Sequence, residues 1–311
     1  MSTLNLVDSE LRAFFEAFPK FELNDESVKT IRELEAAAIS LEKLPRGIER
    51  QEISIPSLDG ASEVRVLLYR NSDTGKPTAG YLHMHGGGLV LGAPEQADSR
   101  NALICQQLGI TVLSVDYRLA PEHPYPAALN DCYAALAYLH SNADSLCIDP
   151  QRIAIGGDSA GGGLAASVAL LAADLDEYAI CHQQLVYPML DSRTGGSMPV
   201  RDSTLGEFCW TPQSNQWAWA AYLGETKADD AYVPALAKSL LKLPPTWLGV
   251  GDLDLFLPEN LEFAEKLRDA GIKVNIDLYP GAPHAFNLVR EARVTQKFYK
   301  DFFRALKLGT A

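Results

Sequence analysis

Three well-separated residues of this 311-residue chain have the types and the order of a nucleophilic catalytic triad. Ser159 lies at the centre of residues 157–161, which read GDSAG, after a short apolar run and before a helical run of small residues. A strand, a sharp turn and a helix in this order expose a serine hydroxyl as a nucleophile. Glycines must flank the serine because the turn leaves little room for side chains. The stretch predicts Ser159 as the nucleophile of an acyl-transfer reaction.

A second signal is the run 85–88, HGGG, which follows the apolar residues 81–84. Acyl transfer places negative charge on the former carbonyl oxygen, and backbone N–H groups stabilise that charge where the chain can approach closely. We expect Gly86 and Gly87 to supply two such donors. The N–H of Ala160, at the positive end of the helix after the nucleophile, is expected to be the third.

A serine hydroxyl needs a base at neutral pH, and in this arrangement the base follows both the nucleophile and the acid along the chain. His182 and His284 are the two histidines beyond Ser159. His182 begins an apolar run, so we interpret it as structural. His284 lies in a turn-rich loop, residues 280–284 (PGAPH), just after an expected strand. His284 is therefore the predicted base.

Two aspartates compete for the role of the acid. Both follow the apolar run 246–250, in residues 251–256 (GDLDLF). Asp252 is nearest the strand end and could instead accept hydrogen bonds from local backbone N–H groups. We therefore prefer Asp254 as the group that orients the imidazole of His284 and stabilises its charged form.

The rest of the chain predicts an α/β fold. Short apolar runs alternate with helical ones, which is typical of a mostly parallel sheet with helices on both faces. Residues 4–44 are predicted to be helical, and residues 51–55 and 63–69 to form an antiparallel pair at a sheet edge. The further strands are expected at 81–84, 110–115, 153–155, 184–187, 246–250 and 274–278, and the helices at 97–108, 127–140, 162–172, 258–270 and 292–306.

These motifs, in this order, resemble the hormone-sensitive-lipase-like esterases, also called bacterial lipase family IV. The resemblance is carried by HGGG at 85–88, DYRLAPEHPYPAA at 116–128, GGDSAGGGLAA at 156–166, YPMLD at 187–191 and GDLDLF at 251–256. It implies an α/β-hydrolase fold. The family's acid stands some thirty residues before its histidine, which favours Asp254 over Asp252 as the partner of His284.

The resemblance also implies a helical cap over the site, built from N-terminal helices and a middle insertion. Residues 1–45 and the aromatic-rich residues 192–222 match these two parts. The α/β-hydrolase core would then comprise residues 46–191 and 223–311. The residues alone leave open whether the aromatic side chains form a lid or only pack a helix against the body.

The leading hypothesis is a serine carboxylesterase that hydrolyses short to medium acyl esters through an acyl-enzyme, without a metal or organic cofactor. An amidase, a deacetylase or a lactonase would use the same triad. A non-catalytic small-molecule receptor is the alternative outside enzymes. Receptors that resemble this family have lost the catalytic histidine, so the presence of His284 argues against that alternative.

Composition limits the partners and the compartment. The formal net charge of −13 disfavours nucleic acid and anionic membrane surfaces. Five cysteines, an odd number without metal-ligand spacing, indicate reduced and mostly buried thiols. Residues 1–18 contain charged residues among the apolar ones, unlike a secretory signal, and no run is long enough to span a membrane. A cytoplasmic protein is expected, and the resemblance allows a homodimer joined through the strand at 274–278.

Overall fold

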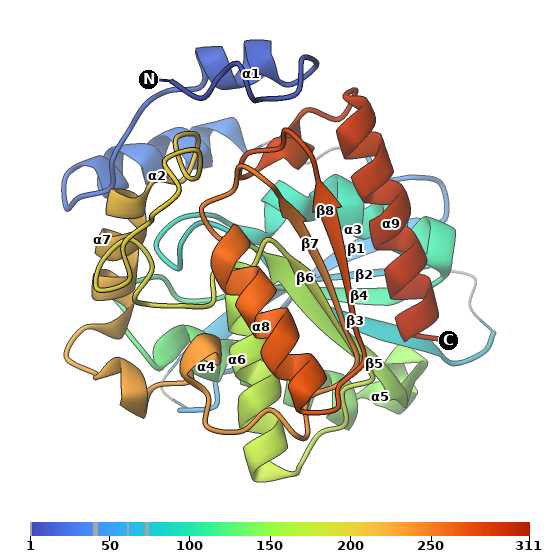
Figure 1. The fold of residues 1–311 in the computed structure, drawn as a ribbon. Helices are drawn as coiled ribbons and strands as arrows, with labels where there is room; N and C mark the ends of the chain where they lie inside the picture. The colour runs from blue at the N-terminus through green and yellow to red at the C-terminus, as the bar shows by residue number, and fades with distance from the viewer. Residues whose placement is uncertain (1, 40–42, 61, 72–74) are drawn as a thin grey trace.

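An eight-stranded sheet forms the centre of the molecule (Figure 1). The computed structural model describes residues 2–39, 43–60, 62–71 and 75–311. The strands are β1 (Ile48–Pro56), β2 (Glu63–Asn71), β3 (Thr78–Met84), β4 (Thr111–Asp116), β5 (Ile148–Asp158), β6 (His182–Val186), β7 (Thr246–Gly251) and β8 (Val274–Tyr279). The eight predicted strands are therefore all present.

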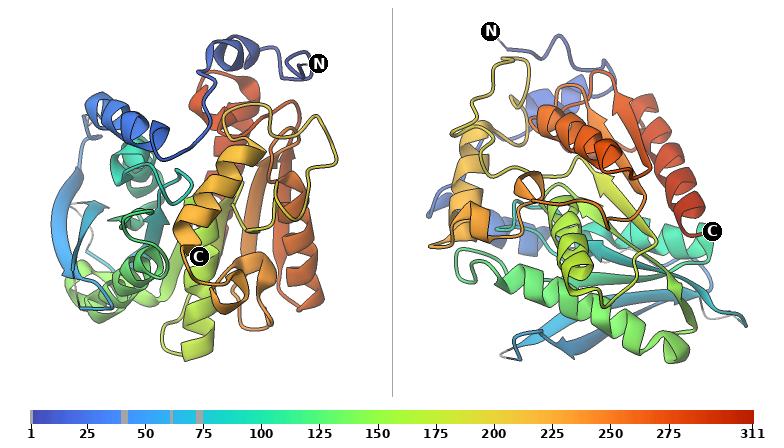
Figure 2. Two further views of the ribbon diagram at one scale, coloured as in Figure 1. Left: turned by 90° about the vertical axis from the view of Figure 1, so that its left-hand side faces the viewer. Right: turned by 60° about the horizontal axis from the view of Figure 1, so that its bottom comes forward.

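The order of the strands is β1-β2-β4-β3-β5-β6-β7-β8. β2 pairs antiparallel with β1 and β4, and the other neighbours pair parallel. Figure 2 shows the two ends of the sheet, with β1 and β2 in blue at one edge and the orange strands β7 and β8 at the other. The prediction of a mostly parallel sheet with an antiparallel pair at one edge is confirmed.

Helices cover both faces of the sheet (Figure 1). One face carries α3 (Asp98–Leu108) and α9 (Arg293–Gly309), and the other carries α4 (Ala127–Ser141), α6 (Ala160–Leu175) and α8 (Leu257–Asp269). The short helix α5 (Ala143–Leu146) follows α4. The five predicted helices are found within a few residues of their expected bounds. β3 and β6 are buried along almost their whole length because apolar helices lie on both of their faces.

The N-terminal region contains helices, as predicted, but they do not cover the whole of residues 4–44. Two separate helices form, α1 (Arg12–Ala17) and α2 (Ser27–Ala38). Phe18 is extended, with φ −64° and ψ 130°, because the proline that follows disfavours helical backbone at this position. The side chain of Asn24 then accepts hydrogen bonds from the backbone N–H groups of Glu26 and Ser27, which starts α2. Residues 40–42 of the predicted helix lie outside the described residues.

The N-terminal region contacts the predicted insertion, where α7 (Pro212–Leu223) forms. Thr211 begins this helix by accepting a hydrogen bond from Ser214 N, and Pro212 occupies the first turn, where its missing N–H costs nothing. The hydroxyl of buried Ser214 accepts a hydrogen bond from Leu23 N at 3.1 Å. These two segments are therefore joined although they are far apart in the sequence.

All five cysteines lie in the described part of the chain and are free thiols. Cys105 and Cys132 are buried, and the other three are partly exposed. Across the described residues, each helix is either too short or too polar to cross a lipid bilayer.

Candidate active site

The turn between β5 and α6 holds Ser159 in an uncommon backbone conformation. Its φ of 55° and ψ of −119° lie in a region that residues with side chains rarely adopt. A Cβ at Gly161 would collide with the carbonyl oxygen of Met84, so glycine is required at this position. Ser159 N also donates a hydrogen bond to Val186 O at 2.8 Å, which ties the turn to β6. The surrounding core therefore fixes the position of the serine.

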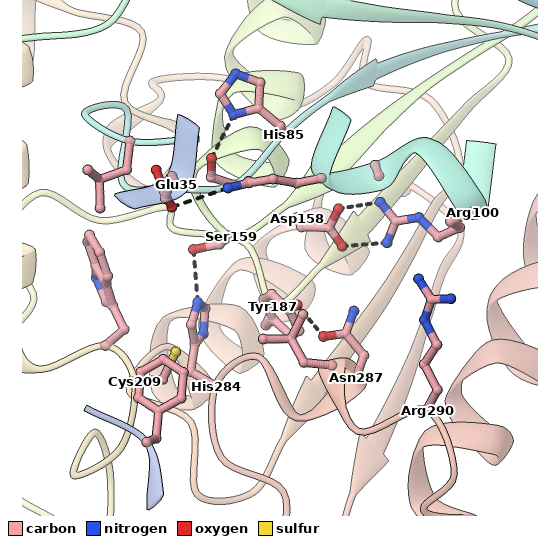
Figure 3. A pocket seen from close by; sticks show the side chains of 18 of the residues that line it. Glu35, His85, Arg100, Asp158, Ser159, Tyr187, Cys209, His284, Asn287 and Arg290 are labelled. Carbon is pink, nitrogen blue, oxygen red and sulfur yellow. Dashed lines mark hydrogen bonds and ion pairs between the residues drawn. The ribbon is translucent and has the colours of Figure 1, made fainter. Parts of the chain in front are cut away.

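Ser159, His284 and Asp254 form one chain of hydrogen bonds, and Figure 3 shows the bond between Ser159 and His284. Ser159 Oγ lies 3.0 Å from His284 Nε2, and His284 Nδ1 lies 2.8 Å from Asp254 Oδ2. Asp254 is fully buried, and its other oxygen accepts a hydrogen bond from Phe256 N at 2.9 Å. A hydroxyl next to an imidazole that a carboxylate orients is the arrangement that activates serine. The structure thus brings together the three predicted triad residues.

The competing acid, Asp252, lies elsewhere in the same loop. It is exposed, and its carboxylate accepts a hydrogen bond from Gly281 N at 2.7 Å. This bond joins the loop after β7 to the turn that precedes His284. Asp252 therefore braces the loop through the backbone, while Asp254 contacts the imidazole.

Two aromatic rings hold the imidazole of His284. The ring centroid of Tyr187 lies 4.5 Å from that of His284, and Phe256 meets the imidazole edge-on at 5.3 Å. The hydroxyl of Tyr187 donates a hydrogen bond to Asn287 Oδ1 at 2.8 Å. These contacts limit rotation of the imidazole. Tyr187 and Phe256 belong to two of the sequence motifs, but nothing in those motifs indicates this supporting role.

The glycine-rich loop after β3 lies directly beside Ser159. A Cβ placed on Gly86 would lie 3.6 Å from the Cβ of Ser159. Gly87 has a φ of 112°, and a Cβ there would collide with the carbonyl oxygen of Leu91. Ala160 follows Ser159 and begins α6. The three residues predicted to donate N–H groups to an oxyanion, Gly86, Gly87 and Ala160, are therefore neighbours of Ser159.

His85 supports this loop as a neutral side chain. Its Nδ1 donates a hydrogen bond to Gly86 O at 2.7 Å, and its ring stacks on Tyr117 with 4.1 Å between centroids. Burial lowers the pKa of His85 to about 4, so the imidazole is uncharged near neutral pH. The hydroxyl of Tyr117 donates to His85 O at 2.8 Å and completes the support.

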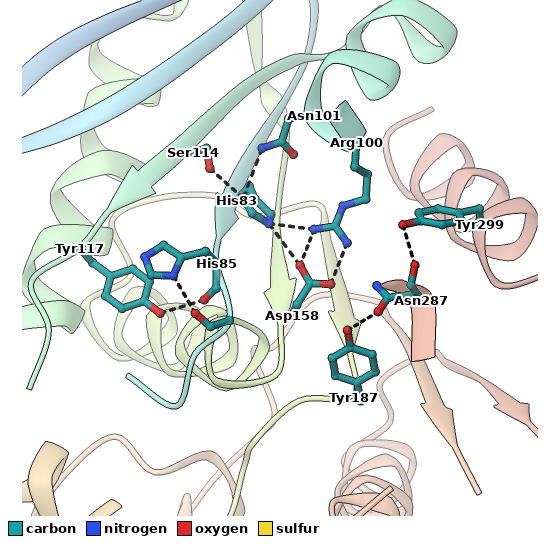
Figure 4. A network of polar contacts seen from close by, with 11 residues as sticks. His83, His85, Arg100, Asn101, Ser114, Tyr117, Asp158, Tyr187, Asn287 and Tyr299 are labelled. Carbon is teal, nitrogen blue, oxygen red and sulfur yellow. Dashed lines mark hydrogen bonds and ion pairs between the residues drawn. The ribbon is translucent and has the colours of Figure 1, made fainter. Parts of the chain in front are cut away.

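Asp158, the residue before Ser159, forms a buried ion pair with Arg100 (Figure 4). Arg100 of α3 donates to both carboxylate oxygens of Asp158, at 2.7 Å to Oδ1. His83 completes the cluster, because its Nε2 lies 3.0 Å from Arg100 Nη2 and its Nδ1 lies 2.8 Å from Ser114 Oγ. Asp158 also lines the cavity beside Ser159.

The charge of Asp158 depends on Arg100. Burial alone would raise the pKa of this carboxyl, but the adjacent guanidinium outweighs burial and lowers the pKa well below its ordinary value. The pair is therefore ionised on both sides. Arg100 also lies over the ring of Phe302, at 5.2 Å from its centroid.

Glu259 of α8 is another buried carboxyl. It accepts hydrogen bonds from Leu190 N at 2.6 Å and from the hydroxyl of Thr194. Burial without a cationic partner raises the pKa of Glu259 to about 8. This side chain holds the segment after β6 against the helix that follows Asp254.

A cavity of about 520 Å³ opens beside Ser159 and His284. Apolar side chains from the N-terminal region, the glycine-rich loop and the insertion line part of it, namely Phe18, Phe21, Leu91 and Trp210. Figure 3 shows Glu35 and Cys209 on the side of Ser159 and His284, and Arg100 and Arg290 on the opposite side. Burial raises the pKa of Cys209 to about 12, so its thiol is neutral.

His182, the other histidine beyond Ser159, is far from this cavity. It opens β6 opposite Ala154, whereas the end of β6 pairs with Asp158. Its Nε2 lies 2.8 Å from Gln184 Oε1, and the imidazole is buried. Its place in the core fits the structural interpretation of His182.

Comparison with known proteins identifies the family. The sequence profile of a family described as the alpha/beta hydrolase fold matches residues 81–288. The chain belongs to the α/β-hydrolase family, in its hormone-sensitive-lipase-like branch. The resemblance that the motifs indicated is thereby confirmed.

Several relatives in this α/β-hydrolase family are named as esterases or ester hydrolases. The carboxylic ester hydrolase LipN of Mycobacterium tuberculosis is 36% identical over 245 residues, which are 77% of this chain and 64% of LipN. The chain thus matches a little under two thirds of the length of LipN. The ethyl acetate hydrolase of Pseudomonas putida is 30% identical over 76% of this chain and 74% of its own length. A solved structure called bacterial heroin esterase is 35% identical, with a TM-score of 0.92 and full coverage of both chains.

Proposed function

We propose that this chain is a serine carboxylesterase and that Ser159, His284 and Asp254 are its catalytic triad. The observation that carries the proposal is the continuous hydrogen-bond chain from Ser159 Oγ through the imidazole to a fully buried carboxylate. Named esterases and ester hydrolases among the relatives support the same class of reaction.

The reaction starts when Ser159 Oγ attacks the ester carbonyl carbon and His284 Nε2 takes the hydroxyl proton. The carbonyl oxygen becomes negatively charged, and we assign the N–H groups of Gly86, Gly87 and Ala160 as its donors. His284 then gives the proton to the leaving alcohol, and an acyl-enzyme remains. A water molecule repeats the sequence, releases the acid and restores Ser159.

Short to medium acyl chains are the proposed substrates. The apolar lining of the cavity supports this range, because Phe18, Phe21 and Trp210 offer an acyl chain apolar contacts beside Ser159. No cofactor or metal takes part in the proposed steps.

The test is steady-state hydrolysis of p-nitrophenyl esters from acetate to palmitate by the protein and by Ser159→Ala. We expect a maximum at short or medium chains and a loss of kcat on the order of 10⁴-fold or more in Ser159→Ala. Turnover that survives in Ser159→Ala would refute the nucleophile. Inertness towards every ester, with hydrolysis of amides or lactones instead, would replace the carboxylesterase by one of those activities.

We further propose that residues 1–45 and 192–222 form a cap over a core made of residues 46–191 and 223–311. The hydrogen bond between Leu23 N and Ser214 Oγ supports this division, as does the bond from Trp217 Nε1 to Asp25 at 3.3 Å. A cytoplasmic location remains a proposal that rests on the free thiols. A homodimer through β8 is also a proposal, supported by the position of β8 at the sheet edge, and size-exclusion chromatography with light scattering would test it.

A further inference from the structure

Two charged side chains of α2 bind the backbone of the glycine-rich loop. Arg32 Nε donates to Val90 O at 2.8 Å, and its Nη2 donates to Ala120 O at 2.6 Å. Three residues further on, Glu35 accepts a hydrogen bond from Gly92 N at 3.1 Å. Residues three apart lie on the same face of a helix, so one face of α2 binds both a carbonyl and an N–H group of this loop.

The bound part of the loop is coupled tightly to the two glycines beside Ser159. Val90 N and Leu91 N both donate to Gly87 O, at 3.1 and 2.8 Å. A Cβ on Gly92 would collide with the carbonyl oxygen of Gly86, so these two glycines are in direct contact. In such close packing, a displacement of Val90 or Gly92 moves Gly86 and Gly87 as well.

A loop of this composition needs an external support. Glycines have a wide range of accessible backbone conformations, and the loop lacks side chains that could anchor it at these positions. Hydrogen bonds to a charged partner are stronger than those between neutral groups. Arg32 and Glu35 provide such bonds. The remaining guanidinium nitrogen of Arg32, Nη1, forms an ion pair with Glu122 at 2.9 Å.

We propose that Arg32 and Glu35 are positioning residues that hold Gly86 and Gly87 in the geometry needed to stabilise the oxyanion. The inference rests on the proposed function, because it assumes that these glycines are oxyanion donors. Such donors must lie within a few tenths of an ångström of their ideal place to stabilise the transition state. Helix α2 therefore contributes to the stabilisation of the transition state rather than to substrate binding. The N-terminal region then takes part in catalysis as well as covering the site.

The experiment compares Arg32→Met and Glu35→Ala with Lys29→Met and Glu33→Ala, which remove exposed charges from the same helix. Three quantities are measured: kcat and KM for p-nitrophenyl butyrate, Ki for an alkyl trifluoromethyl ketone, and Ki for butyrate. Ser159 attacks the ketone and forms an adduct that carries an oxyanion. Butyrate binds without forming such an adduct.

We expect kcat to fall on the order of 10- to 100-fold in Arg32→Met and Glu35→Ala, which is less than the loss of a whole oxyanion donor. KM and the Ki of butyrate should change less than about threefold, and the Ki of the ketone should rise in parallel with the loss in kcat. Arg32→Lys, which keeps a cation and a donor, should recover part of the activity. Both control variants should behave like the unaltered protein.

Unchanged kcat and ketone affinity in both variants would overturn the inference. So would equal losses in ketone and butyrate binding, because they would indicate a general structural role. If Glu35→Ala does not fold, Glu35→Gln, which retains one acceptor, replaces it in the same comparison.

Hydrogen exchange of residues 85–92 separates this inference from the proposed function. Should the protein show no Ser159-dependent hydrolysis, the catalytic proposal fails, but faster exchange of Gly92 N–H in Glu35→Ala would still support the positioning of the loop by α2. Unchanged exchange throughout 85–92 would overturn that positioning, whatever the activity.

Discussion

An ion pair supports the cavity on the side of the sheet, and another supports it on the side of α2. The two pairs differ in how far their side chains are exposed to solvent. Behind the nucleophile, Arg100 and Asp158 form an ion pair in which the side chains are 10% and 15% exposed. On the α2 side, Arg32 and Glu122 form a pair in which the exposed fractions are 24% and 51%. Water screens the second pair and not the first.

This difference separates two requirements of the proposed reaction. The nucleophile side is bound into the core, where removal of one charged partner leaves the other uncompensated. The glycine-rich loop is instead held by charged side chains of α2, and water competes for part of that contact. We therefore expect changes on the sheet side to affect stability and changes on the α2 side to affect mainly kcat.

The two aspartates after β7 give the largest expected contrast between a buried and an exposed contact. In Asp254→Asn the amide can no longer hold the imidazole in the correct tautomer, so kcat should fall on the order of 10⁴-fold. In Asp252→Asn a carbonyl oxygen can still accept the hydrogen bond from Gly281 N, so activity should stay within a few-fold. Steady-state hydrolysis of p-nitrophenyl butyrate measures both effects.

Circular dichroism and thermal unfolding of the two asparagine variants provide the control, since both should remain folded. The assignment of the acid would be wrong if Asp252→Asn lost as much activity as Asp254→Asn.

Arg100→Met should cause the largest loss of stability. It leaves Asp158 buried without its partner, and removing one member of a buried ion pair typically costs about 3 to 5 kcal/mol of unfolding free energy. Denaturant unfolding measures this loss. The double variant Arg100→Met/Asp158→Asn, in which no unpaired charge remains, should be more stable than Arg100→Met alone. A double variant that is less stable than the single one would contradict the importance of charge pairing.

The sequence predicted the parts of the site that depend on local motifs. The strand, elbow and helix around Ser159 carry their own signal because steric crowding at Gly157 and Gly161 restricts the residue type. The same holds for the glycines at 86 and 87. The sheet followed from alternating apolar and helical runs, which are also local patterns.

The contacts that the sequence did not predict join residues far apart in the chain. Arg32 and Val90 are 58 positions apart, as are Arg100 and Asp158, and no motif marks either pair. Arg100 could have been suspected, because a charged residue at a buried position of an amphipathic helix needs a partner. Arg32 and Glu35 lacked such a signal, since charges on a surface helix are usually solvated. The helical region expected over residues 4–44 forms only in part, because Pro19 and Asn24 separate two helices.

Buried Glu259 should make the free energy of unfolding depend on pH. Its pKa is raised to about 8 by burial, from an ordinary value of 4.5. The folded protein therefore keeps a proton on Glu259 that the unfolded chain loses. The contribution of Glu259 to the free energy of unfolding is fully present below pH 4.5 and declines as the pH rises towards 8. Between pH 5 and 7, the free energy of unfolding of the unaltered protein should fall by about 2 to 3 kcal/mol more than that of Glu259→Gln, which has no charge to bury.

Denaturant unfolding at several pH values measures this difference. Glu265→Gln, at an exposed position of the same helix, is the matched control and should follow the unaltered protein. If the unfolding free energies of Glu259→Gln and the unaltered protein changed with pH in parallel, Glu259 would not hold a proton in the folded state.

Glu122→Gln should have the smallest effect, because it removes the exposed half of the contact between α2 and the loop region. Arg32 keeps its hydrogen bonds to Val90 O and Ala120 O, so the loop stays in place. Exposed ion pairs contribute about 0 to 1 kcal/mol, so the loss of unfolding free energy should lie in that range and kcat should change less than about twofold. Unfolding and hydrolysis, measured beside Arg100→Met and Arg32→Met, check both values. A loss in Glu122→Gln as large as that in Arg100→Met would mean that this ion pair is as important as the buried one, and depth would no longer distinguish the two sides of the cavity.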